Sequence, residues 1–212
     1  MKGFLQLEDG SCFEGELSVE GEAEAEVVFT TGMCGYYESL TDPSFAGQIL
    51  VFTFPLIGNY GVADKEQWES EKIHVKGVVV SEECTAWSHY AGVCSLAEWL
   101  KAETIPLLTG VDTRALTKKL RQGGTLLGKI SSKKERVVLQ PSRENLVALV
   151  ARKQKHVYGT GKKRVIAVDC GMKESIIRQL IRFPIEVIRV PYNYDYTNEE
   201  YDGVFLSNGP GD

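Results

Sequence analysis

The sequence lacks any apolar run long enough to cross a membrane, since its densest one is the four residues GVVV at 77–80. That short run is typical of a buried strand. The first ten residues, MKGFLQLEDG, also lack the apolar core of a signal peptide. The five cysteines are odd in number and irregularly spaced, which excludes a regular disulfide framework and favours reduced thiols. We therefore expect a cytoplasmic protein that does not enter a membrane.

Charge is unevenly distributed along the chain, although the net charge of −5 is ordinary. The segment 8–26 holds eight acidic residues and no basic one, whereas 133–164 holds ten basic residues and two acidic ones. A basic segment can bind phosphate-rich partners. Tyr158 is the only phenylalanine, tyrosine or tryptophan in this segment that could stack on bases, so we interpret the segment as a solvated connector and expect no nucleic acid partner.

The first part of the sequence reads as strands divided by glycines and followed by helices. Asp9-Gly10, between two alternating segments, predicts a β-hairpin. Ser95, with Glu98 three residues later, predicts a capping box at the start of a helix. Asp112 is expected to cap a second helix, and Ser142 to start a short third one.

The composition becomes polar, basic and glycine-containing at 153–163, KQKHVYGTGKK. This change indicates a linker between two domains, 1–152 and 164–212. After the linker comes a strand, a helix, a strand and a further strand, the opening pattern of a parallel α/β sheet. Ligands bind such sheets at the carboxyl ends of the strands. Asp169 and the segment 208–212 both fall at such ends.

Three motifs that suggest chemistry are incomplete. The stretch GTGKK at 159–163 lacks the earlier glycine and the Ser/Thr of a phosphate loop and precedes a strand instead of following one. Cys84, His89 and Cys94 lack the tight cysteine pair and the fourth ligand of a zinc site, so we expect no metal. Cys170 lies between a strand and a helix, but no histidine is near it in sequence; we interpret it as a half-buried structural residue.

Two short segments can be read either as structural turns or as parts of a binding site. In TDPSF at 41–45, proline fixes one φ angle and Ser44 is expected to cap the next turn of the chain. In NGPGD at 208–212, the glycines leave backbone N–H groups uncovered by side chains. A ligand or a developing negative charge could then approach these groups closely.

Taken together, five stretches resemble one family along essentially the whole chain, in the same order. The sequence resembles the small, glutamine-hydrolysing subunit of carbamoyl phosphate synthetase, which also occurs fused at the start of larger polypeptides of pyrimidine biosynthesis. The stretches are LEDGSCFEGE, EVVFTTGMCGYYESLTDPSFAGQILVFTFPLIGNYG, GVDTRALTKKLRQGGTLLGKI, VIAVDCGMK and GVFLSNGPGD.

The resemblance implies an α/β fold: an N-terminal β/β/α domain of the swivelling type, then the first βαβ part of a class I glutamine amidotransferase domain. It implies that the whole enzyme hydrolyses L-glutamine through a cysteine thioester. The ammonia passes to the synthetase large subunit, or to fused synthetase domains, which use ATP, bicarbonate and magnesium for pyrimidine or arginine biosynthesis. No cofactor is implied for this chain itself.

By position, the resemblance assigns glutamine contacts to Ser44, Gly209 and Gly211, with the Gly209 N–H as a candidate oxyanion-hole donor. The family's catalytic cysteine, histidine and glutamate lie further along than this chain extends, so we expect the chain alone to be catalytically silent. Two alternatives stay open. The chain could be a docking module for the synthetase part, or it could come from an ammonia-dependent relative without glutaminase activity.

Overall fold

The computed structural model describes residues 1–134 and 144–211, so the expected helix start at Ser142 lies outside the described residues. Contacts divide the chain into two compact units. Unit 1 comprises Met1–Thr41 and Gly47–Arg143, and unit 2 comprises Asp42–Ala46 and Glu144–Asp212. The division after Arg143 places segment 144–163 in unit 2, whereas the sequence had suggested a boundary at the linker 153–163.

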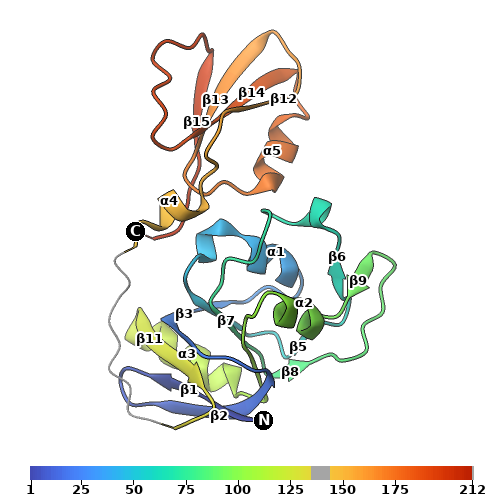
Figure 1. The fold of residues 1–212 in the computed structure, drawn as a ribbon, viewed down its shortest axis with the longest axis vertical. Coiled ribbons are helices and arrows are strands. Elements are labelled where there is room, and N and C mark those ends of the chain that lie inside the picture. The colour runs from blue at the N-terminus through green and yellow to red at the C-terminus, as the bar shows by residue number, and fades with distance from the viewer. Residues whose placement is uncertain (135–143, 212) are drawn as a thin grey trace. The chain divides into compact units, whose positions relative to one another are not determined.

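The described part of unit 1 is built on a closed barrel (Figure 1). Its strands, in the order in which they pair, are β1 (Lys2–Leu7), β11 (Leu126–Ser131), β3 (Ala23–Thr30), β4 (Ile49–Phe52), β7 (Gly77–Val79), β10 (Leu107–Thr109) and β2 (Cys12–Val19). Strand β2 pairs antiparallel with β1 and closes the barrel. The predicted hairpin at Asp9-Gly10 is confirmed, because Gly10 has φ +86° and the Asp9 carboxylate accepts the Ser11 N–H at 2.9 Å.

Strand β4 of the barrel buries apolar residues on both of its faces. All four residues of β4 are buried, which explains why this strand reads as a continuous apolar run. Gly128 of β11 gives space inside the barrel, since a Cβ at this position would lie 2.5 Å from Cγ2 of Val27. The core of unit 1 therefore fills the barrel with branched aliphatic side chains.

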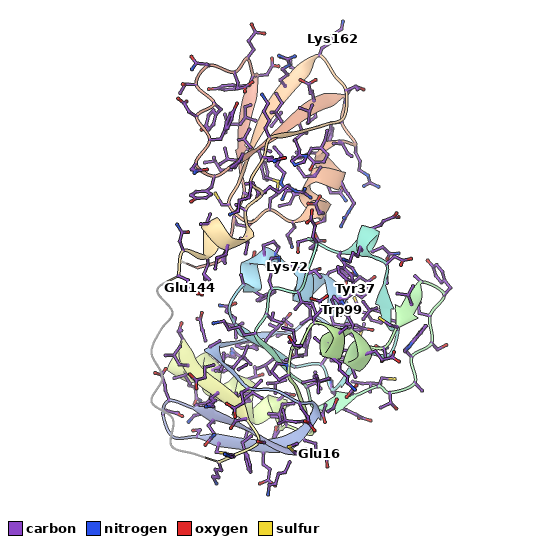
Figure 2. All side chains as sticks on the ribbon, in the orientation of Figure 1. Glu16, Tyr37, Lys72, Trp99, Glu144 and Lys162 are labelled. Carbon is purple, nitrogen blue, oxygen red and sulfur yellow. The ribbon has the colours of Figure 1, made fainter. Side chains whose placement is uncertain are left out.

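Short helices and two ribbons complete the described part of unit 1. They are α1 (Tyr36–Thr41), η2 (Lys65–Gln67), α2 (Leu96–Ala102), α3 (Thr113–Gly123), the pair β5 (Leu56–Ile57) and β8 (Glu82–Glu83), and the pair β6 (Val62–Ala63) and β9 (Gly92–Cys94). The capping box of Ser95 and Glu98 is confirmed, and Asp112 caps α3 by accepting the Ala115 N–H at 2.9 Å. Trp99 of α2 and Tyr37 of α1 are buried, as their place among the side chains shows (Figure 2). Across residues 1–134 and 144–211, none of the helices has the length and apolar character needed to cross a membrane.

Unit 2 is a four-stranded sheet with helix α5 on β14 (Figure 1). The strand order is β12 (His156–Tyr158), β14 (Ile185–Pro191), β13 (Lys163–Asp169) and β15 (Gly203–Leu206); the helical segments are η1 (Pro43–Phe45), α4 (Leu146–Val150) and α5 (Glu174–Leu180). The predicted βαβ pattern and the following strand are confirmed, since β13 is parallel to both β14 and β15. Two details differ from expectation: β12 is a strand inside the expected linker, and Asn145 caps α4.

The two faces of this sheet are covered by different groups. Ala167 and Val187 pack with Ile177 of α5, whereas Ile166 and Ile188 pack with the half-buried rings of Tyr194 and Tyr196. On the tyrosine side, β15 is poorly covered, because Val204 is 41% and Leu206 68% exposed. The mixed α/β character of the chain is confirmed.

Candidate functional site

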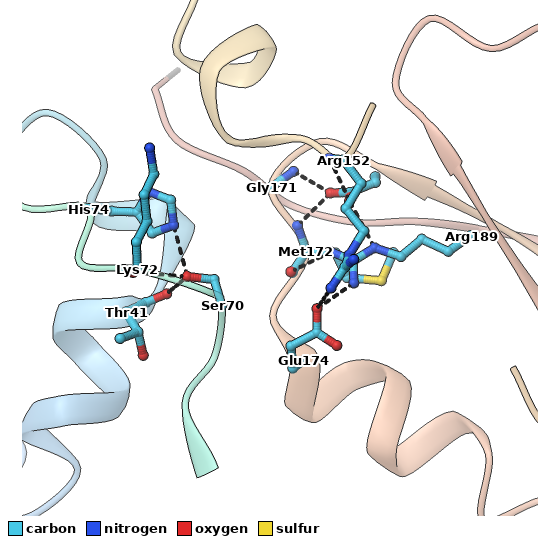
Figure 3. Close-up of polar contacts among 10 residues, drawn as sticks. Thr41, Ser70, Lys72, His74, Arg152, Gly171, Met172, Glu174 and Arg189 are labelled. Carbon is cyan, nitrogen blue, oxygen red and sulfur yellow. Dashed lines mark hydrogen bonds and ion pairs between the residues drawn. The ribbon is translucent and has the colours of Figure 1, made fainter. Parts of the chain in front are cut away.

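The carboxylate of Asp169, the last residue of β13, organises the turn that follows this strand. Asp169 is fully buried. Its Oδ1 accepts the N–H groups of Gly171 and Met172, each at 2.8 Å, and its Oδ2 accepts the Arg152 N–H at 3.1 Å (Figure 3). A buried carboxylate needs such donors to offset its loss of hydration. The turn 170–172 is therefore fixed by the strand end itself.

Arg189 supplies the opposite charge from the neighbouring strand. In the parallel register Ala167 lies beside Arg189, so Arg189 and Asp169 project from the same face of the sheet. Nε of Arg189 donates to Asp169 at 2.8 Å, Nη1 to Glu174 at 2.6 Å, and Nη2 to the Met172 carbonyl at 3.0 Å (Figure 3). Burial alone would lower the pKa of Arg189, but the carboxylates of Asp169 and Glu174 outweigh it and raise this pKa.

The Gly-Pro-Gly turn after β15 rests on the backbone of Cys170. Ser207 Oγ accepts the Cys170 N–H at 2.9 Å and donates to the Asn208 carbonyl at 2.7 Å. A Cβ at Gly209 would lie 1.9 Å from the Cys170 carbonyl oxygen, so this position requires glycine for close packing of two backbones. Gly209 thus has a structural reason to be glycine, whatever it binds.

Gly211 differs from Gly209 because, among the residues described, no other backbone lies where its Cβ would be. It has φ +82°, in the left-handed region that favours glycine, and a Cβ built there would meet no atom within 4 Å. Among the residues described, no acceptor takes the N–H of Gly209 or that of Gly211. The turn therefore presents backbone donors at the carboxyl end of a strand.

Ser44 lies in the short helix η1. The contacts of this helix place it in unit 2. The cap of this helix is Asp42 and not Ser44, because the Asp42 carboxylate accepts the Ser44 N–H at 2.9 Å. The same carboxylate lies 3.5 Å from Nζ of Lys173. The Ser44 hydroxyl is half-buried and, within the described part of the chain, has no hydrogen-bond partner. The turn thus fixes the backbone of Ser44 and leaves its hydroxyl available to a ligand.

Gly171 lies close to both candidate turns. Its φ is +113°, and a Cβ built on it would lie 3.3 Å from Cβ of Pro43 and 3.0 Å from Cδ of Pro210. Pro43 precedes Ser44, and Pro210 stands between Gly209 and Gly211. The residues predicted from the sequence as binding residues therefore lie on two turns that meet at one glycine.

Cys170 is unsuited to nucleophilic attack in this environment. Burial, and next the charge of Asp169, raise the pKa of its thiol, which keeps it protonated near neutral pH. It is half-buried and a free cysteine, as expected from the sequence. Cys84, His89 and Cys94 form no metal site: within residues 1–134 and 144–211 no three His, Cys, Asp or Glu residues could together hold a metal ion.

Sequence reasoning missed the pairing of Asp169 with Arg189 and the role of Gly171. A signal for the first was present, since Arg189 is a charge within the otherwise apolar stretch VIRV at 187–190. The site as described offers one hydroxyl and uncovered backbone N–H groups. These groups suit a small polar ligand or an oxygen that gains negative charge.

Comparison with known proteins gives matches along the whole chain. A family model described as "Carbamoyl-phosphate synthase small chain, CPSase domain" matches residues 5–130, and one described as "Glutamine amidotransferase class-I" matches residues 166–212. The carbamoyl phosphate synthase arginine-specific small chain of Bacillus subtilis is 47% identical over 216 residues, covering 100% of this chain. This chain spans 60% of the length of that relative.

Two larger proteins match as well. The multifunctional protein CAD of Squalus acanthias is 45% identical over 98% of this chain, which corresponds to 10% of that protein. The mitochondrial carbamoyl-phosphate synthase [ammonia] of Aquarana catesbeiana is 43% identical over 98% of this chain and 15% of its own length. The first family model covers most of unit 1 together with segment 42–46 of unit 2, and the second falls within unit 2.

We predict that Arg189→Leu destabilises unit 2 by about 3 kcal/mol, because it leaves the buried Asp169 carboxylate without its counter-charge. Hydrogen exchange of the β13 and β14 amides measures this change. All three tryptophans lie in unit 1, so tryptophan fluorescence provides an internal control that should stay the same. Lys163→Met, which removes an exposed ion pair of 2.9 Å with Asp202, should destabilise unit 2 far less than Arg189→Leu does. Equal effects of the two substitutions would contradict the role given to Arg189.

Proposed function

Because the chain belongs to the carbamoyl-phosphate synthase small chain family, we propose that the whole protein containing it is a glutamine-dependent carbamoyl phosphate synthetase. In this proposal the whole protein hydrolyses L-glutamine and passes ammonia to a synthetase large subunit or to fused synthetase domains. That synthetase part uses ATP, bicarbonate and magnesium. The closed barrel of unit 1 supports its assignment as the swivelling-type β/β/α domain.

The glutamine site in this proposal consists of Ser44, Gly209 and Gly211. The observation that carries it is the meeting of the two turns at Gly171, where a Cβ would lie within 3.3 Å of Pro43 and 3.0 Å of Pro210. The Ser44 hydroxyl would contact the bound glutamine, and the open space beside Gly211 would hold part of it. The Gly209 N–H would donate to the amide oxygen as it becomes an oxyanion, an interaction whose loss typically costs about 100- to 1000-fold in turnover.

The nucleophile of the whole protein is, in this proposal, a cysteine other than Cys170. A nucleophilic cysteine needs a lowered pKa or an adjacent base. Cys170 has a raised pKa, and its backbone N–H and carbonyl serve to seat the Gly-Pro-Gly turn. The 212-residue chain by itself is therefore proposed to bind glutamine without hydrolysing it.

A second candidate function is ammonia-dependent synthesis without glutaminase activity. One relative, 43% identical over 98% of this chain, is named as an ammonia-dependent synthase. The available Ser44 hydroxyl favours the glutamine-dependent function, because nothing in the fold of η1 uses it. Comparing glutamine and ammonium as nitrogen donors with the whole protein separates the two functions.

We predict that Ser44→Ala lowers kcat/KM for glutamine in the whole protein and leaves ammonia-dependent synthesis unchanged. The loss of one hydrogen bond costs about 1 kcal/mol, or roughly fivefold, and more if the partner is charged. Both activities are measured as carbamoyl phosphate formed. A parallel fall in the two activities would show that Ser44 supports the fold and not the glutamine site.

Gly211→Asn is expected to lower glutamine-dependent synthesis by about tenfold or more, again without loss of the ammonia-dependent reaction. Asparagine tolerates the left-handed region, so the new side chain fills the space beside the turn with little strain. Gly10→Asn is the matched control, because Gly10 has φ +86° and a Cβ there also meets no atom within 4 Å. If both variants behave alike, the space beside Gly211 does not hold the substrate.

For Cys170 we predict that substitution has little effect on chemistry. The 212-residue chain should release no glutamate from glutamine above a blank, and Cys170→Ser in the whole protein should retain glutaminase activity within a few-fold. The physical reason is that its thiol has a raised pKa. Glutamate release by the 212-residue chain that disappears in Cys170→Ser would assign the nucleophile to this residue.

A further inference from the structure

The segment 42–46, which carries Ser44, is a short excursion of the chain. The chain leaves unit 1 after Thr41 and re-enters it at Gly47. Contacts group the segment with unit 2, but the chain joins both of its ends to unit 1, so its position also depends on how these two ends are held. Both ends are held by the loop that leads into β7.

The outgoing end is held at Thr41, which is fully buried. Its hydroxyl donates to the Tyr37 carbonyl at 2.8 Å and accepts the Glu69 N–H at 2.9 Å. Its carbonyl accepts the hydroxyl of Ser70 at 2.6 Å (Figure 3). The peptide that links Thr41 to Asp42 is therefore anchored by a side chain of the loop.

The returning end is held by the backbone of His74. The His74 carbonyl accepts the Gly47 N–H at 3.1 Å, and the His74 N–H donates to the Leu40 carbonyl at 3.0 Å. One residue thus contacts the chain on both sides of the excursion. The His74 side chain adds a third link, since its Nε2 lies 2.8 Å from Ser70 Oγ (Figure 3).

The direction of the Ser70–His74 hydrogen bond follows from its other partners. Ser70 Oγ also lies within hydrogen-bond distance of the carbonyls of Thr41 and Lys72, at 2.6 and 3.1 Å. Carbonyls only accept, and a hydroxyl has one proton to give. The His74 Nε2 therefore carries a proton and donates it to Ser70. This direction excludes His74 as a base that activates Ser70, although the pair resembles a nucleophile and its base.

We propose that Ser70 and His74 are positioning residues for Ser44, acting as a clamp on both ends of the segment 42–46. This inference rests on the proposed function, in which Ser44 contacts glutamine. The clamp lowers the freedom of the segment before the ligand arrives, so less of the binding energy is lost in ordering it. Neither Ser70 nor His74 needs to touch glutamine for this effect.

The test compares Ser70→Ala, Ser70→Thr and Ser39→Ala in the whole protein with its synthetase part. Ser39 is the matched control, because its hydroxyl also donates to a backbone carbonyl, that of Gly35 at 2.8 Å, but away from the excursion. Two quantities are measured: KM and kcat with glutamine and with ammonium, and hydrogen exchange of the amides of residues 44–46.

We expect Ser70→Ala to raise KM for glutamine about fivefold, the value of one hydrogen bond, and to leave the ammonia-dependent reaction unchanged. Exchange at residues 44–46 should accelerate by a similar factor. Ser70→Thr, which keeps the hydroxyl, should restore both values, and Ser39→Ala should change neither.

Unchanged exchange at residues 44–46 in Ser70→Ala would overturn the clamp, whatever the function of the protein. Faster exchange with an unchanged KM for glutamine, in a protein where Ser44→Ala raises that KM, would overturn the positioning role. If Ser44→Ala itself leaves glutamine use unchanged, the proposed function of Ser44 fails, and the exchange data alone then decide whether Ser70 holds the segment.

Discussion

The buried carboxylate of Asp169 is the interaction on which the candidate site depends. It receives N–H groups from three separate places: Arg152 in the segment after α4, the turn after β13, and the Arg189 side chain of β14. A buried carboxylate is tolerated only with such partners, so the strand end, the turn and the neighbouring strand are ordered together. The next two residues then serve as the base of the site. The carbonyl group of Cys170 packs against Gly209, and Gly171 lies close to both Pro43 and Pro210.

Three glycines near this turn meet three different physical needs. Gly209 is glycine because another backbone lies where its Cβ would be, and Gly171 because two prolines and a positive φ leave no room. Gly211 is glycine by conformation alone, with free space around it. Only the last arrangement leaves room for a ligand beside the α-carbon. A glycine-rich turn in a sequence therefore predicts that some other group packs closely against its backbone. Only the structure shows whether that group is another part of the protein's own backbone or a ligand.

Local signals made much of the fold predictable, and long-range contacts account for what was missed. Asp9-Gly10 and the Ser95–Glu98 box each act over a few residues, and the strand–helix–strand pattern after the linker is read from short consecutive segments; each prediction is confirmed. Strand β12 was missed because it is three residues long, polar at its flanks and defined only by pairing with β14. The sequence predicts Ser44 as the cap, but the Asp42 carboxylate accepts the N–H two residues further on, as a short carboxylate often does in such turns. The link between Asp169 and Arg189 appears only once the register of two strands is known.

The polar atoms of the proposed site come mainly from the backbone, and this has a consequence for how nitrogen donors are distinguished. Backbone N–H groups of Gly209 and Gly211 are present whatever the neighbouring side chains, provided the turn forms. The conformation of this turn depends on Asp169, Ser207 and the glycines, and these residues are needed for folding. A relative can therefore share this fold at 43% identity and bear a name that specifies ammonia. In the proposed site, Ser44 contributes the one side-chain hydroxyl that folding does not use. The choice between glutamine and ammonia, as far as this chain influences it, is then expected to depend on Ser44 and on the contacts that hold its segment in place.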